Sequence, residues 1–85
     1  MVKSRSDIFL VRGVDMTVKE YRVSLSWSVS ELARRAKLST KTINRIEDGQ
    51  PTYDYTLNSV ARAFSEALGK TVTIRDLEGV QIIES

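Results

Sequence analysis

The sequence predicts an all-α domain of four to five helices, with candidate short strands at its two ends. Three observations lead to this prediction. The patterns T-x-x-E and S-x-x-E, beginning at Thr17 and Ser28, are typical of helix N-termini. Two short segments of helical spacing are joined by only a few residues. A longer apolar stripe of helical period follows them and ends at Gly69.

Composition limits the function classes. The 85-residue chain is long enough for one small domain and too short for two. It has no Cys and no His, which removes disulfides, thiolate or histidine metal sites and the usual general base near neutral pH. No apolar run reaches the roughly 18 residues that cross a bilayer. The N-terminal IFLV is also shorter than a signal-peptide core of about 7–15 residues. We therefore expect a cytoplasmic protein that is not an enzyme and uses no cofactor or metal.

The small net charge of +2 conceals an uneven distribution. Residues 1–46 hold ten Lys and Arg against four Asp and Glu, a balance of +6. Residues 47–85 hold three against seven, a balance of −4. A basic face on the N-terminal half is therefore expected, and such a face favours an anionic partner.

The N-terminal part predicts an extended arm and then a helix. Residues 8–14, IFLVRGV, are rich in β-forming residues and predict a short strand within an arm of residues 1–16. The capping box that begins at Thr17 predicts a first helix over 18–25.

Two more short helices follow. The S-x-x-E pattern at Ser28 predicts a second helix over 29–36. Ser39 or Thr40 can cap a third helix over 40–47, and the following Asp-Gly pair supplies residues that end a helix.

The fourth helix is the core helix of the prediction. Thr52 is its candidate cap, and Gly69 closes it. Its apolar stripe consists of Leu57, Val60, Ala61, Phe64 and Leu68. Residues 73–77, TIRDL, predict a short fifth helix, and the tail at 79–85 is a candidate strand that pairs with the N-terminal arm. The domain would then span 17–78.

The second and third helices form a helix-turn-helix pattern at 29–47. Leu38, Ile43 and Ile46 would face the core, so the other side chains of the third helix must point outward. A helix that buries one edge and exposes the other has the right shape for the major groove of DNA. The side chains that would contact bases are Thr40, Lys41, Asn44 and Arg45. Arg34, Arg35 and Lys37 would meet phosphates, and the loop after the third helix adds Thr52 and Tyr53 as phosphate contacts.

The segments containing Arg22, WSVSELARRA, STKTINRIEDG and TLNSVARAF resemble the Xre and phage-repressor (lambda-repressor-like) helix-turn-helix family. The resemblance covers about residues 18–68 and implies a DNA-binding protein of bacterial or phage type. It implies base contacts from the same four residues, with Ser39 near the groove wall. It also implies a structural ion pair between Arg22 and Glu47.

Two positions depart from the family pattern. Val29 stands where a phosphate-binding Gln is frequent in the family. The DNA contact that this Gln makes is therefore not expected here. Lys37 stands where a Gly is frequent in the turn, which predicts a non-Gly residue in the left-handed region and a charge close to DNA.

The sequence leads to a sequence-specific regulator of transcription, in the first place a repressor, that binds double-stranded DNA as a homodimer. The dimer contacts are expected in the C-terminal half, at Ile74, Leu77, Val80, Ile82 and Ile83. One alternative is an antitoxin that holds a protein partner through its tail and regulates its own operator. Another is a helix-turn-helix domain that has lost DNA binding.

The remaining aromatic and acidic residues that could suggest a site are interpreted as structural or solvated. Trp27 precedes a capping Ser, where apolar residues commonly pack against the helix entry, so a role in stacking on single-stranded bases is rejected, as it is for Tyr53 and Tyr55. The carboxylates of Asp76, Glu78 and Glu84 lack any nearby sign of a cleft or metal and are interpreted as solvated charges.

Overall fold

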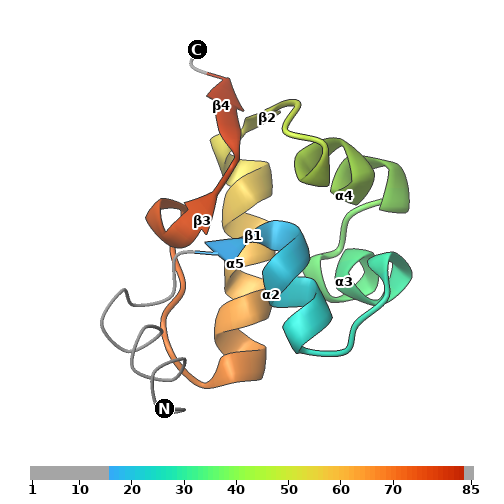
Figure 1. The fold of residues 1–85 in the computed structure, drawn as a ribbon, viewed down its shortest axis with the longest axis vertical. Helices are drawn as coiled ribbons and strands as arrows, with labels where there is room; N and C mark the ends of the chain where they lie inside the picture. The colour runs from blue at the N-terminus through green and yellow to red at the C-terminus, as the bar shows by residue number, and fades with distance from the viewer. Residues whose placement is uncertain (1–15, 84–85) are drawn as a thin grey trace, which may run out of the picture.

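The computed structural model describes residues 16–83, and four α-helices dominate this range (Figure 1). The elements are β1 (Met16–Thr17), α2 (Val18–Ser24), α3 (Val29–Ala36), α4 (Thr40–Glu47), β2 (Pro51–Tyr53), α5 (Asp54–Leu68), the 3-10 helix η1 (Ile74–Asp76), β3 (Leu77–Glu78) and β4 (Gln81–Ile83). The predicted all-α class is confirmed, and the three short helices begin at the predicted residues. The strand predicted at 8–14 lies outside the described residues.

The N-termini of the short helices are fixed by side-chain caps. Thr17 accepts a hydrogen bond from the Glu20 amide at 3.0 Å, and the Glu20 carboxylate accepts one from the Thr17 amide at 2.9 Å, so α2 has a complete capping box. Ser28 accepts from the Glu31 amide at the start of α3. Ser39, not Thr40, caps α4. These bonds satisfy amides that a helix end otherwise leaves without partners.

The turn between α3 and α4 depends on a left-handed residue. Lys37 has φ 60° and ψ 43°, as its position in the family pattern predicts, and its amide donates back to the last turn of α3. The Leu38 amide then donates to the Ala33 carbonyl at 2.8 Å. The turn therefore has good backbone hydrogen bonding but holds a β-carbon in a region that only Gly enters without strain.

Replacing Lys37 by Gly is expected to stabilise the domain by about 0.5–1 kcal/mol. Removal of the β-carbon relieves the left-handed strain, and the greater chain entropy of Gly in the unfolded state offsets part of the gain. Urea unfolding followed by circular dichroism measures the difference. Lys37→Ala is the matched control: it removes the same charge but keeps the β-carbon, and an equal gain in both variants would contradict the explanation by strain.

The core forms where α2, α3 and α4 pack around α5. Its largest fully buried side chains include Tyr21, Leu32, Ile43 and Phe64, one from each helix. Tyr21 stacks on Phe64 with ring centroids 4.9 Å apart. Ala33 is 4% exposed, and its small side chain lets α4 pack close to α3. The helix-turn-helix unit is thus held by a single core.

The start of α5 differs from the prediction. The helix begins at Asp54 with Tyr53 at the cap position and no side-chain cap, so the prediction of Thr52 as cap is wrong. Thr52 is 8% exposed in β2, and its hydroxyl donates to the Gln50 carbonyl. The strand pairing with β4 places this residue in the sheet and buries it. Gly69 ends α5 with φ 72°, as predicted.

The C-terminal segment also differs in detail. The predicted fifth helix is a 3-10 turn over Ile74–Asp76, and Leu77 already belongs to β3. β3 pairs in parallel with β1, whereas the tail strand β4 pairs in parallel with β2, with Thr52 opposite Ile82. In the described range the tail therefore lies beside the loop after α4, and not beside the N-terminal strand, as Figure 1 also shows.

Candidate nucleic-acid interface

The four side chains predicted to contact bases share the exposed face of α4. Ile43 is fully buried and Ile46 is 3% exposed, so these two residues attach the opposite edge of the helix to the core. The exposed residues are Thr40, Lys41, Asn44 and Arg45. This arrangement leaves two cations, an amide and a hydroxyl available to one partner surface, and no acidic residue lies among them.

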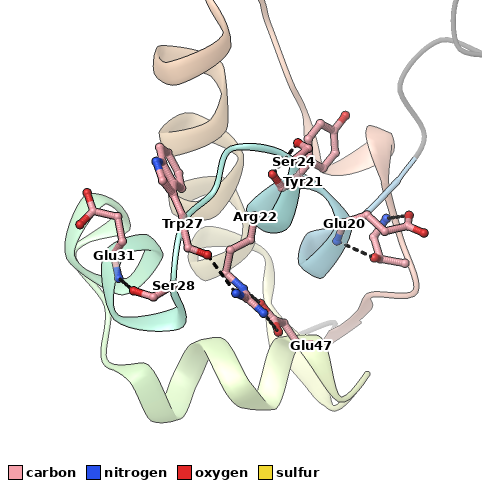
Figure 2. A network of polar contacts seen from close by, with 9 residues as sticks. Glu20, Tyr21, Arg22, Ser24, Trp27, Ser28, Glu31 and Glu47 are labelled. Carbon is pink, nitrogen blue, oxygen red and sulfur yellow. Dashed lines mark hydrogen bonds and ion pairs between the residues drawn. The ribbon is translucent and has the colours of Figure 1, made fainter. Parts of the chain in front are cut away.

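The predicted ion pair between α2 and α4 is present (Figure 2). Arg22 Nε lies 2.6 Å from Glu47 Oε2, and Nη2 lies 3.1 Å from Oε1, which makes the contact bidentate. Arg22 Nη1 also donates to the Trp27 carbonyl at 3.0 Å. The side chains are only 12% and 10% exposed. Hydrogen bonding to Glu47 raises the pKa of Arg22 above its ordinary value despite the opposing effect of burial, so the guanidinium stays charged. The pair fixes the end of α4 against α2.

The basic residues of α3 are less free than the sequence suggests. Glu31 accepts from Arg35 Nε at 2.6 Å and also binds Arg34, so one carboxylate contacts both guanidinium groups. The sequence indicated Glu31 only as part of the S-x-x-E capping pattern, and its pairing with the two Arg residues that follow it on the helix was not predicted. The hydrogen bond from Arg35, and then that from Arg34, lowers the pKa of Glu31. The contact therefore stabilises the fold above the ordinary carboxyl pKa and is lost when acid protonates Glu31.

Arg35 lies on the α5 side of α3. Its guanidinium carbon is 4.5 Å from the centre of the Trp27 ring, which itself stacks on Phe64 of α5. Together with Lys37 it lines a cavity whose other walls come from α5, with no residue of α4. The structure thus does not bring Arg35 together with the base-contacting candidates.

The other residues predicted to contact phosphate differ in exposure: Ser39 and Tyr53 are exposed, and Thr52 is buried. Ser39 is exposed, but its hydroxyl already accepts from the Thr42 amide at 3.1 Å and lies 2.9 Å from the Thr42 hydroxyl. Tyr53 is 46% exposed and stacks on Tyr55 with ring centroids 5.4 Å apart. Thr52 is 8% exposed and its hydroxyl donates to the Gln50 carbonyl, so it has little free surface for a DNA phosphate.

A groove beside α4 was not expected from the sequence. It has a volume of about 200 Å³ and is lined by Thr42, Arg45, Pro51, Thr52, Tyr53, Thr56 and Ile83. The residues come from α4, β2, α5 and β4, which are separated by up to 41 positions in the chain. Thr42 and Thr56 add hydroxyls next to Arg45. No spacing rule predicts this groove, because it depends on the parallel pairing of β2 with β4.

The residues expected at a dimer surface differ in exposure. Leu77 is 5% exposed and belongs to the core of the single chain, so it has little surface for a second copy. Ile74 and Val80 are half-buried against that core. Ile82 is 44% exposed in β4, and Ile83 is half-buried beside the groove. The burial of Leu77 follows from the pairing of β3 with β1.

Within the described range, no cluster of three acidic, His or Cys side chains could hold a metal ion. None of the helices in residues 16–83 combines the length and the apolar character that a membrane crossing requires.

A helix-turn-helix family model of the Xre and lambda-repressor-like type matches residues 18–75, more than half of the chain. The searches of curated proteins and of solved structures gave no significant match. The matched range contains α2 to α5 and the ion pair, and the family is one of DNA-binding regulatory domains, not of enzymes. The chain belongs to the Xre and lambda-repressor-like helix-turn-helix family of DNA-binding transcription regulators.

Proposed function

We propose that this protein is a sequence-specific repressor that inserts α4 into the major groove of its operator. The observation that carries the proposal is the division of α4 into a buried apolar edge and an exposed face bearing Lys41, Asn44 and Arg45. Lys and Arg can donate to guanine O6 and N7, and Asn can form two hydrogen bonds with adenine. Thr40 at the first turn can donate, accept or contact a thymine methyl group.

Selection of bound duplexes from a random pool tests sequence specificity. We expect enrichment of a short motif, repeated as a palindrome whose half-sites lie about one helical turn apart if two copies bind together. A pool that shows no enrichment, together with binding that is weak and uniform over all duplexes, would contradict base recognition by α4. It would favour a helix-turn-helix domain that has lost sequence-specific binding.

Phosphate contacts are proposed for Arg34, Lys37, Ser39 and Tyr53, which are exposed residues of α3, of the turn and of the loop after α4. Arg34 and Arg35 project roughly 100° apart on their helix, and only Arg35 is held over Trp27. Arg34 is 69% exposed despite its contact with Glu31. We therefore propose a phosphate contact for Arg34 and none for Arg35 or Thr52.

Arg34→Ala is expected to reduce the slope of log affinity against log salt concentration by about one unit, because one phosphate contact and its released counterion are lost. Arg35→Ala is the matched variant and is expected to leave the slope unchanged. Fluorescence anisotropy with the selected duplex at several salt concentrations gives both slopes. If Arg34→Ala keeps the parental slope, Arg34 does not contact phosphate.

We propose that the repressor acts as a homodimer whose contacts lie in the tail, at Val80, Ile82 and Ile83. The exposed apolar side chain of Ile82 supports this proposal and equally fits an antitoxin that holds a protein partner through β4. The solution mass distinguishes the two. A dimer that Ile82→Asp converts to monomer supports self-association, whereas a monomeric parent that copurifies with a chain encoded beside it supports the antitoxin.

A further inference from the structure

A second basic site lies between α3 and α5. It is a cavity of about 290 Å³ lined by Arg35, Ala36, Lys37, Ser59, Arg62, Ala63 and Glu66. Three cations and one carboxylate therefore surround it. None of the lining residues belongs to α4, so the site is separate from the proposed base-contacting face.

The cations of this site differ in how they are held. Arg35 is fixed by its hydrogen bond to Glu31 and by its position over Trp27. Lys37 and Arg62 are exposed, and neither forms an ion pair or a side-chain hydrogen bond within residues 16–83. Lys37 also stands in a strained left-handed conformation that Gly would relieve. Two cations without an ion-pair partner in the described range thus line the cavity beside Arg35, whose guanidinium is held in place.

The size and chemistry of the cavity indicate the ligand class. Its volume of about 290 Å³ is just below the roughly 300–1,000 Å³ typical of small-molecule sites. Ala36 and Ala63 are the only apolar residues that line it, so an apolar ligand would gain little there. Arg binds phosphate oxygens through paired N–H donors, and Lys adds a point charge. A compact anion with several negative oxygens matches this set.

We propose that the cavity between α3 and α5 binds the phosphoryl or pyrophosphoryl group of a small phosphorylated molecule. Arg62 and Lys37 supply the free charge, and Arg35 supplies an oriented donor. Glu66, one turn after Arg62 on α5, opposes the anion and limits its affinity. The same chemistry occurs in the DNA backbone, and Lys37 is also proposed above as a phosphate contact. The other two cations, Arg35 and Arg62, are not among the proposed DNA contacts, and no α4 residue lines the cavity, which favours a free ligand.

Titration of the folded, full-length protein with inorganic pyrophosphate tests the proposal. Amide chemical shifts are followed by NMR at constant ionic strength, with chloride replaced by pyrophosphate. We expect saturable shifts at Ser59, Arg62 and Ala63, and no comparable shifts at Lys41 and Asn44. Equal shifts on both faces, or shifts that do not saturate, would overturn the site.

Three variants measure the contribution of each charge. Arg62→Gln and Lys37→Gln are each expected to weaken pyrophosphate binding about threefold, the range of exposed ion pairs. Glu66→Gln is expected to tighten it by a similar factor. Lys41→Gln removes a cation from α4 and serves as the control, with unchanged pyrophosphate affinity. If Arg62→Gln and Lys41→Gln lose affinity equally, the effect is one of net charge and the proposal fails.

DNA-binding measurements on the same variants distinguish a free phosphorylated ligand from the phosphates of the DNA backbone. With the selected duplex, Arg62→Gln is expected to keep the parental affinity and salt slope, whereas Lys41→Gln is expected to lose affinity. A shallower slope in Arg62→Gln would assign the cavity to the DNA backbone and overturn the free ligand. Because pyrophosphate binding is measured without DNA, its outcome is independent of the proposed repressor function.

Discussion

Arg22→Ala is expected to destabilise the domain by about 3–5 kcal/mol, because it leaves the Glu47 carboxylate buried without its partner. The two side chains are 12% and 10% exposed, and the contact between them is bidentate. The Trp27 carbonyl also loses the donor it has 3.0 Å away. Small domains are stable by only about 5–15 kcal/mol, so this loss is a large part of the total. Urea unfolding followed by circular dichroism measures it.

Two controls separate the ion pair from general effects. Arg75→Ala removes an exposed cation that forms no ion pair within residues 16–83, and it is expected to cost less than about 0.5 kcal/mol. The double variant Arg22→Met, Glu47→Leu replaces both charges by apolar groups and is expected to recover most of the stability lost in Arg22→Ala. An Arg22→Ala protein within about 1 kcal/mol of the parent would show that the pair is effectively solvated.

The double variant Lys41→Ala, Arg45→Ala is expected to bind the selected duplex about a hundredfold or more weakly, since each well-placed base contact contributes about 1–3 kcal/mol. Both residues are exposed on α4 and neither forms an ion pair within residues 16–83, so the fold does not depend on them. Fluorescence anisotropy at one fixed salt concentration measures affinity, and circular dichroism confirms the helix content.

The matched control is Lys19→Ala, Arg75→Ala, which removes the same two residue types from exposed positions outside α4. It is expected to reduce affinity only slightly, through the change in net charge. Comparable losses in the two double variants would mean that α4 contributes charge and not base contacts. Equal binding by the Lys41→Ala, Arg45→Ala variant and the parent would exclude α4 from the interface altogether.

The local structure of the helices could be predicted because it depends on neighbours in the chain. Caps such as Thr17 and Ser39 act over three residues, and buried positions such as Ile43 and Ile46 follow from the helical period. The family pattern added the contact between Arg22 and Glu47, 25 positions apart, which no local rule indicates. The structure then showed that the contact is buried.

The candidate interface was only partly predictable. The position of a residue on a helix indicates whether it is exposed, but not which residues of other elements lie beside it. Glu31 is one turn before Arg35 and pairs with it, yet the Trp27 ring under the same guanidinium is placed by the packing of α5. Thr52 is polar and lies in a loop, but its strand pairing with Ile82 buries it. For these reasons no DNA contact is proposed for Arg35 or Thr52.

By itself the sequence determined the helix class, the first residues of the three short helices and the exposed face of α4, because caps and apolar spacing act within one or two turns. Only the tertiary structure decided the strand partners of the tail, the groove beside Arg45 and the cation site between α3 and α5. These features join residues far apart in the chain. Their positions follow from how the helices pack on one core, and the spacing of residues within one helix or strand does not predict that packing.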